Sequence, residues 1–176
     1  ILGQGPGVRG ASSGGVQYRL QVRELSELSL RGSAEVYVQP LQVGELRVLV
    51  DGSGDARLFA LRSDLLDLEL RGSGDLLVAE LTTRELRAVL AGSGDVHVRE
   101  LSARRVGIVV NGSGDLSVEQ STGPALDELK VNLVGSGDID LRGLPARQAE
   151  VNVLGSGSAR LGRVNVVVND PTFDKV

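Results

Sequence analysis

The side chains with the clearest capacity for chemistry are the carboxylates of a recurring Gly-Ser-Gly-Asp sequence. Five copies end in Asp55, Asp75, Asp95, Asp115 and Asp138, each with a serine hydroxyl nearby. Oxygen ligands of this kind suit Ca²⁺, so a column of calcium sites is one hypothesis. Ca²⁺ takes six or more oxygens, whereas each copy offers one carboxylate and one hydroxyl. We therefore favour a structural role, in which these oxygens accept hydrogen bonds from turn amides, and expect no metal ion or cofactor.

Other catalytic sets are poorly supported by the sequence. His97 is the only histidine, and its outward position between Leu77 and Ser117 predicts an ordinary surface residue. No Ser/His/Asp or Cys/His set is expected, and without cysteine there are neither disulfides nor thiolate metal sites. The glycine-rich turns precede strands rather than helices, so they lack the helix N-terminus that binds phosphate. The arginines are expected to be solvated. The sequence predicts no enzyme.

A fixed period sets the positions of these residues. The first glycines of the copies follow one another every 20 residues from Gly32 to Gly112, then after 23 residues at Gly135 and after 20 at Gly155. Degenerate copies, Gly32-Ser33-Ala34-Glu35 and Gly155-Ser156-Gly157-Ser158, stand at the two ends. The predicted structural turns contain the glycine pairs Gly52 and Gly54, Gly72 and Gly74, Gly92 and Gly94, Gly112 and Gly114, and Gly135 and Gly137. Such a period indicates a solenoid, in which each repeat is one turn of a stack.

Apolar residues alternate with polar ones on both sides of each turn. Leu66, Leu68 and Leu70 precede one turn, and Leu76 and Val78 follow it. This period of two predicts two short strands in each repeat and argues against helices. We predict an all-β fold, a right-handed parallel β-helix of about seven 20-residue coils, with the three-residue insertion at 120–127 as a surface loop. The alternative is an antiparallel meander of 10-residue hairpin arms.

Three segments are expected along the chain. Residues 1–16 form a glycine-rich N-terminal arm, residues 17–168 the β-helix domain and residues 169–176 a C-terminal tail. The chain begins at Ile1 without a basic-then-apolar signal, which predicts a processed or trimmed product and is compatible with secretion.

The composition of the chain narrows the classes of binding partner that we expect. The net charge is −4 and the basic residues are scattered, so nucleic acid is not an expected partner, and no apolar run is long enough to enter a bilayer. Only Tyr18, Tyr37, Phe59 and Phe173 are aromatic, so the sequence offers little support for a glycan site.

Apolar residues on the outer face of the strand before each turn predict an interaction face. Its members are Leu49, Val89, Val109, Val134, Leu154 and Val167, interrupted by Glu69, Asn132 and Asn152. Such a stripe usually marks a contact surface, so a protein partner or self-association is expected. Either the arm or a second subunit is a candidate to cover it.

The Gly-Ser-Gly-Asp turns, each followed by an alternating strand, resemble the bacterial head GIN domain family of auto-transporter adhesins. So does the segment Arg23-Glu24-Leu25-Ser26-Glu27-Leu28-Ser29-Leu30. The resemblance covers about residues 17–168 and implies a parallel β-helix shaped like pectin lyases but without their catalytic residues. It also implies an extracellular, cell-surface or periplasmic location. The degenerate end copies then indicate specialised terminal coils.

The resemblance makes a non-enzymatic adhesion or scaffolding module of the cell envelope the first functional hypothesis. A self-assembling filament subunit, joined through the arm or the open coil ends, is the alternative. An enzyme acting on polysaccharide would rest on fold analogy alone, and the sequence pattern predicts no groove of clustered acids or arginines.

Overall fold

The computed structural model describes residues 24–164. The expected arm, the start and end of the predicted domain at residues 17 and 168, Val167 and the tail lie outside the described residues. Residues 24–164 form strands, turns and bends without a helix, so this part of the chain has no helix that could cross a membrane.

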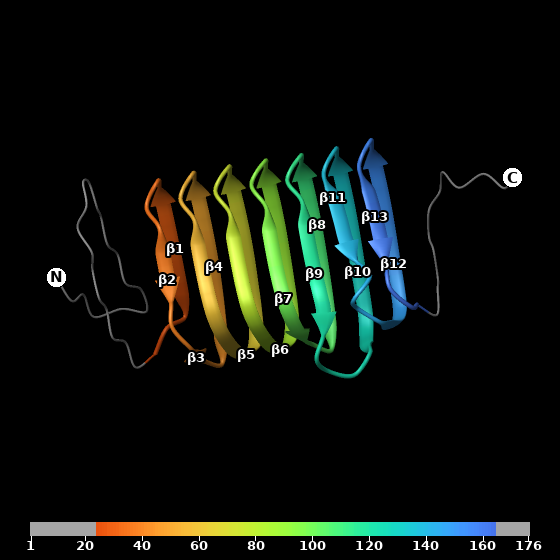
Figure 1. The fold of residues 1–176 in the computed structure, drawn as a ribbon, viewed down its shortest axis with the longest axis horizontal. Coiled ribbons are helices and arrows are strands. Elements are labelled where there is room, and N and C mark those ends of the chain that lie inside the picture. Colours follow the sequence, from red (N-terminus) through yellow and green to blue (C-terminus); the bar gives the residue numbers. More distant parts are fainter. Residues whose placement is uncertain (1–23, 165–176) are drawn as a thin grey trace, which may run out of the picture.

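Seven coils stack side by side along one axis (Figure 1). Five whole strands lead into the Gly-Ser turns: β1 (Glu27–Gly32), β4 (Glu45–Gly52), β8 (Arg105–Gly112), β10 (Leu126–Gly135) and β12 (Ala146–Gly155). Six follow the turns: β2 (Val36–Val38), β3 (Leu41–Gln42), β7 (Val96–Ser102), β9 (Leu116–Ser121), β11 (Asp138–Leu141) and β13 (Ser158–Leu161). The strands β5 (Ala56–Gly72) and β6 (Leu76–Gly92) continue around the opposite corner and belong to both sets. We call the two outer surfaces the pre-turn face and the post-turn face.

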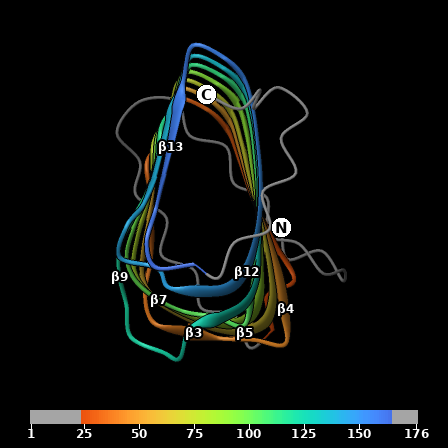
Figure 2. The ribbon, with the colours of Figure 1, turned by 90° about the vertical axis from the view of Figure 1, so that its right-hand side faces the viewer.

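Every strand pair among the described residues is parallel, so the antiparallel meander is wrong. With the C-terminal end toward the viewer, the chain rises through β12, crosses the apex and descends through β13 (Figure 2). It runs counterclockwise while advancing toward the viewer, which is the right-handed sense. The predicted right-handed parallel β-helix is therefore confirmed.

The interior is an aliphatic stack. Leu68, Ile108 and Val131, from three different coils, are buried, as are the corner residues Leu81 and Leu101. The core of the described residues contains Leu, Val, Ile and Ala but no aromatic ring. No buried side-chain nitrogen or oxygen in residues 24–164 lacks a hydrogen-bond partner. Alternation predicts this core because successive side chains on a strand point to opposite faces.

Two glycines allow each turn to lie flat on the one before it. Gly92 has φ of +141°, a region that side chains rarely adopt, and a Cβ there would lie 2.2 Å from the carbonyl oxygen of Gly72. Gly94 lacks a positive φ, but its Cβ would lie 2.0 Å from the carbonyl oxygen of Gly74. The same contacts recur through the stack, so the turns pile up in a line at the apex (Figure 2).

The predicted surface loop lies between β9 and β10, at the corner opposite the turns, where it extends beyond the neighbouring coils (Figures 1 and 2). The amide of Thr122 donates to the carbonyl of Leu101 at 2.9 Å, so the loop stays tied to the preceding coil. After the loop, β10 pairs with β8 in the regular register, with Leu129 opposite Val106.

Candidate functional site

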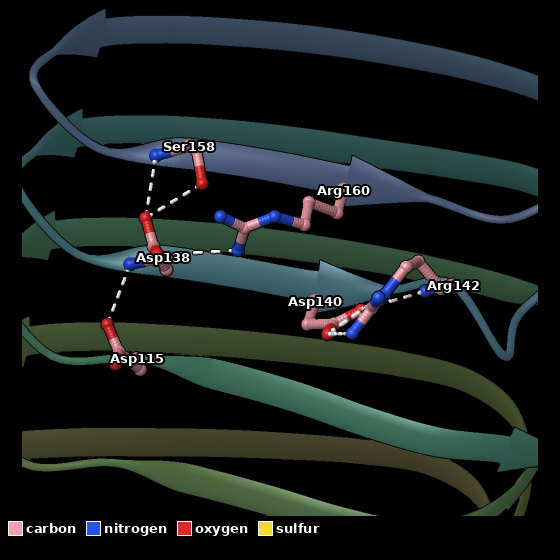
Figure 3. Close-up of polar contacts among 6 residues, drawn as sticks. All are labelled: Asp115, Asp138, Asp140, Arg142, Ser158 and Arg160. Atoms are coloured by element: carbon pink, nitrogen blue, oxygen red, sulfur yellow. Dashed lines mark hydrogen bonds and ion pairs between the residues drawn. The ribbon is translucent and has the colours of Figure 1, made fainter.

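The five turn aspartates form a hydrogen-bonded ladder, which we call the Asp column, and Figure 3 shows its last steps from Asp115 through Asp138 to Ser158. The carboxylate Oδ1 of each accepts the backbone N–H of the residue at the same position one coil later. The donor amides and distances are Asp75 at 3.0 Å, Asp95 at 3.0 Å, Asp115 at 2.8 Å, Asp138 at 2.7 Å and Ser158 at 2.9 Å. The predicted role of the aspartates, which was to satisfy turn amides, is thus observed, and each carboxylate stitches two coils together.

The turn serines do not share this role. Ser73, Ser93 and Ser113 are exposed, and none of their hydroxyls makes a hydrogen bond within residues 24–164. The first glycine of each turn replaces them as acceptor: the carbonyl of Gly72 receives the amides of Ser93 and Gly94 at 2.9 and 3.1 Å. The expected hydroxyl acceptors are therefore wrong, because the backbone itself supplies the acceptor.

Cations lie at the two ends of the Asp column. Arg57 lies 3.9 Å from Asp55, and Arg160 lies 3.4 Å from Asp138. The Ser158 hydroxyl and amide, with the Arg160 guanidinium, hold the pKa of Asp138 below its ordinary value. No three His, Cys, Asp or Glu residues of the described part converge as a metal site, so its geometry lends no support to the calcium hypothesis.

Beside the Asp column, a second column runs along the post-turn face. Register places its members opposite one another from coil to coil: Tyr37, Arg57, Leu77, His97, Ser117, Asp140 and Arg160. The N-terminal part of this column contains the aromatic Tyr37 and the apolar Leu77 on either side of Arg57, whereas its C-terminal part is polar throughout.

At the N-terminal part, two aromatic rings lie open to solvent. Tyr37 is 54% exposed and Phe59 is 47% exposed. Arg57 donates to the Tyr37 hydroxyl at 2.8 Å, with its guanidinium carbon 5.5 Å from the ring centre. The Tyr37 hydroxyl donates to Glu35 at 2.8 Å, and Arg57 lies 3.6 Å from the same carboxylate. We call Tyr37, Arg57 and Phe59 the aromatic platform.

At the C-terminal part, the post-turn sheet has a step. Strand β11 pairs with β9 only at Ile139 and Asp140, and the chain then turns at Arg142 and Gly143, where the Gly143 carbonyl accepts the Ser121 amide at 3.0 Å. A shallow hollow of about 510 Å³ lies at this place, lined by Ser117, Val118, Glu119, Asp140, Arg142 and Gly143. A second hollow of about 380 Å³ adjoins it between the Asp column and His97, with Ser117 and Asp140 shared by both.

His97 is not the isolated surface residue that the sequence suggests. Its Nε2 lies 2.9 Å from the Glu119 carboxylate and its Nδ1 lies 2.7 Å from the Ser117 hydroxyl. A carboxylate only accepts, so a neutral His97 donates to Glu119 from Nε2 and accepts a hydrogen bond from the Ser117 hydroxyl at Nδ1. The sequence predicts no Ser/His/Asp set, but a Ser/His/Glu cluster does form, because β7 and β9 of two adjacent coils bring these residues together.

This relay lacks the other parts of a hydrolytic site. Nucleophilic catalysis needs donors for the developing oxyanion in a site that excludes water. The hollow at the step is shallow, and the Glu119 side chain is 54% exposed. The cluster therefore suits hydrogen bonding to a ligand better than bond cleavage.

The step also gathers acids and arginines, contrary to the expectation from sequence (Figure 3). Arg142 donates to both carboxylate oxygens of Asp140, from Nε at 3.0 Å and from Nη2 at 2.6 Å. Hydrogen bonds from the Arg142 side chain and backbone lower the pKa of Asp140. Both Asp140 and Asp138 are consequently ionised at neutral pH, whereas a general acid needs a raised pKa.

The predicted apolar stripe on the pre-turn face occupies two columns rather than one. Leu49, Val89 and Val109 align with Glu69, Asn132 and Asn152. Val134 and Leu154 align with Ala91 and Asn111 in the column nearer the turn. The Glu69 carboxylate accepts hydrogen bonds from Arg47, at 2.8 Å, and from Arg71. This charged group separates Leu49 from Val89 in their column. Of the predicted residues in the described part, only Val134 and Leu154 are strongly exposed, at 40% and 48%.

The geometry agrees with a comparison against known protein families. One family, described as "Putative auto-transporter adhesin, head GIN domain", matches residues 5–125, which is more than half of the chain. The chain belongs to the head GIN domain family. The match ends at Ala125, so coils six and seven of this head GIN domain, with most of the step, lie beyond it. No curated protein and no solved structure gives a match.

The functional candidates that sequence reasoning missed are Glu119, Asp140, Arg142 and the exposed pair Tyr37 and Phe59. One signal could have found part of this set. Aligning residues by their distance from the turn glycine puts Tyr37, His97, Ser117 and Asp140 at one position, outside the core. The step itself has no such signal, because it depends on where β11 leaves the sheet.

Proposed function

We propose that this head GIN domain is a non-enzymatic adhesion module of the cell surface, which binds its target through the post-turn face. One observation carries the proposal: both aromatic side chains of the described residues and both adjoining hollows lie on that face. Exposed aromatic rings are favoured at binding surfaces because they bury much apolar area with little loss of side-chain freedom.

The remaining features support binding without catalysis. The solenoid is a hydrogen-bonded rod with a dry aliphatic interior, which holds outward side chains at fixed spacing. Every carboxylate of residues 24–164 with a shifted pKa, namely Glu69, Asp138 and Asp140, is shifted downward. Such carboxylates serve as hydrogen-bond acceptors at neutral pH. The family description supports an extracellular or cell-surface location.

Surface display tests the proposal. The full chain, displayed on a non-adherent bacterium, is expected to raise adherence to cultured epithelial cells several-fold. Leu77→Lys, in the centre of the post-turn face, should abolish most of the gain, whereas the matched change Val109→Lys on the pre-turn face should not. Equal display of each variant is checked with an antibody to a tag. If the displayed chain adds no adherence, or both changes act alike, adhesion through this face is wrong.

A second function, filament assembly, is favoured by a different observation. Val134 and Leu154 pair across coils six and seven and leave an exposed apolar patch near the C-terminal end of the pre-turn face. If this patch joins copies of the chain, light scattering should show an increase in mass with concentration that Leu154→Lys abolishes. A monomer at all concentrations, unchanged by deletion of residues 1–15, would exclude assembly.

A further inference from the structure

We infer that the ligand of the post-turn face is a neutral polysaccharide chain lying along the coil axis, stacked on the aromatic platform and hydrogen-bonded at the step. This inference rests on the proposed adhesion function and names the chemistry of its target. It requires three features of this face: accessible rings, a prearranged polar rim and a second polar subsite in line with the first.

The rings are accessible and have no structural role in the described core. Tyr37 and Phe59 are about half exposed, and neither belongs to the buried cluster. Tyr37 pairs with Arg57 in the next coil, and Phe59 lies two residues beyond Arg57, so the two rings are diagonal neighbours on one sheet surface. With strands about 4.8 Å apart and a rise of about 3.3 Å per residue, such neighbours are separated by about 8 Å. A chain of sugar rings can therefore contact both.

The polar rim of the platform is held in place before any ligand binds. Arg57 bonds the Tyr37 hydroxyl, lies over its ring and approaches both Glu35 and Asp55. Side chains fixed by such contacts lose little freedom on binding, which favours affinity. The carboxylates and the guanidinium offer acceptors and donors at the edge of the apolar rings.

This combination matches a pyranose, which has an apolar face of C–H groups and a rim of hydroxyls. Sugar hydroxyls can replace water on the Arg57, Glu35 and Asp55 groups one for one. A protein partner would instead have to desolvate this charged network, and protein interfaces are depleted of charge at their centres. The Asp column beside the platform repels polyanions, which selects a neutral chain over an acidic one.

The polar subsite lies on the same column as the platform. Register runs from Tyr37 through Arg57, Leu77 and His97 to Ser117 at the hollow, four coil steps or about 19 Å. There Glu119 and Arg142 line the same depression, where they offer sugar hydroxyls an acceptor and a donor. An extended oligosaccharide of several rings therefore reaches both ends, which a single sugar cannot do.

Calorimetric titration of the full chain with hexasaccharides tests the inference. The probes are cellohexaose, xylohexaose and maltohexaose, with the hexamer of galacturonic acid as the acidic comparison. At least one neutral hexamer should bind, and the acidic hexamer should bind at least tenfold more weakly. Tyr37→Ala and Phe59→Ala should each weaken binding tenfold or more, and Arg142→Gln should weaken it severalfold. Leu154→Ala, an equally exposed apolar residue on the pre-turn face, should change nothing.

NMR spectra of the wild type give a readout that does not depend on any variant folding. Amide shifts on adding the neutral hexamer should follow Arg57, Leu77, His97 and Ser117. Absence of binding by all three neutral hexamers, preference for the acidic hexamer, or binding indifferent to both aromatic changes would each overturn the inference.

The adhesion assay separates the inference from the function on which it rests. If displayed chain still adheres while no neutral hexamer binds, adhesion stands and the glycan inference is wrong. Adherence lost after trypsin treatment of the target cells, but kept after periodate treatment, would identify a protein target and also overturn it. A displayed chain without adherence refutes the proposed function itself, whatever the titration shows.

Discussion

At the scale of single residues, the turn divides its tasks among glycine and aspartate. The first glycine of each turn has a positive φ, and the second meets the backbone of the preceding turn at a distance that excludes a Cβ. The aspartate satisfies an amide of the next coil with an ionised acceptor, which makes a stronger hydrogen bond than a neutral one. The serine takes part through its backbone amide, and the hydroxyls of Ser73, Ser93 and Ser113 make no hydrogen bond among residues 24–164, so the serine side chain is the most replaceable part of the turn.

Alanine substitutions can separate the two requirements on glycine. Among residues 24–164, a Cβ added at Gly107 or Gly32 would meet no atom within 4 Å, and of these two only Gly32 has a positive φ. Gly94 has only the close contact, and Gly92 has both. Gly107→Ala should stabilise the fold by about 0.5–1 kcal/mol, because alanine loses less chain entropy in a strand. Gly32→Ala should cost about 1–2 kcal/mol, and Gly94→Ala and Gly92→Ala about 3 kcal/mol or more. Urea unfolding gives the order, and a Gly94→Ala as stable as Gly107→Ala would contradict the stacked-turn geometry.

Asp138 makes a prediction about pH. Hydrogen bonds from Ser158 and the nearby Arg160 lower its folded pKa, so ionised Asp138 stabilises the fold above about pH 4. That contribution is lost as the pH falls through the lowered folded pKa. Ser158→Ala removes the hydroxyl donor and should raise the folded pKa of Asp138 toward its unfolded value, so that its contribution to stability is smaller and is completely lost at a higher pH. Carboxyl NMR titration measures the pKa, Ser136→Ala serves as a control without a side-chain hydrogen bond, and an unchanged pKa in Ser158→Ala would refute the assignment.

At the scale of elements, each strand is too short to be stable by itself and depends on the coils on either side. The corners between strands contribute less to these stabilising contacts between coils. The corner of coil five holds the three extra residues, and the strands on both sides keep their register. Corners are thus the places where length can change without moving a side chain to the wrong face.

Deleting residues 122–124 should restore a 20-residue coil at little cost. We expect a change in unfolding free energy below about 1 kcal/mol, because loop length contributes weakly to closure entropy. Deleting residues 102–104 from the regular corner of the preceding coil removes buried Ala103 and the carbonyl of Arg104 that accepts the Asp127 amide at 2.7 Å. That deletion should cost more, and urea midpoints compare the two. Equal losses would show that the insertion is structural.

At the scale of the whole molecule, the solenoid is a stack in which contacts join neighbouring coils. Its stability is then close to a sum of coil and interface contributions. Ser158 and Arg160 are the last described members of the two post-turn columns. At the position of Ser158 the first coil has Glu35 and the next five have aspartate. Ser158 and Arg160 provide donors and a positive charge at the end of the Asp column.

Excising one period tests this description. Removal of residues 76–95 joins Asp75 to Val96, which occupies the same coil position as Leu76. The shortened chain should keep its β-sheet circular dichroism and unfold cooperatively at a lower urea concentration. Removal of residues 76–94 instead shifts the following residues by one position and would turn core side chains outward, so this variant should not fold. Similar behaviour of the two deletions would disprove the stacked register.

The sequence by itself determined the coil, the parallel stack and the aliphatic core. Its information is local and repeated: a glycine pair every 20 residues, and side chains that alternate between two faces. Leu68, Ile108 and Val131 are buried as that alternation requires. The sequence also shows that the apolar stripe of the pre-turn face belongs to two columns. Val134 and Leu154 come one residue before a turn glycine, whereas Val109 comes three residues before one.

Tertiary structure alone decided which groups bond across coils. Whether an aspartate accepts the next coil's amide or binds a cation depends on the spacing and tilt of stacked turns, which residue type does not specify. His97, Ser117 and Glu119 meet only because parallel register places residues 20 apart side by side, and the hollow next to them exists because β11 leaves the sheet after four residues. These features arise from contacts between coils, so the local signals that define each coil do not encode them.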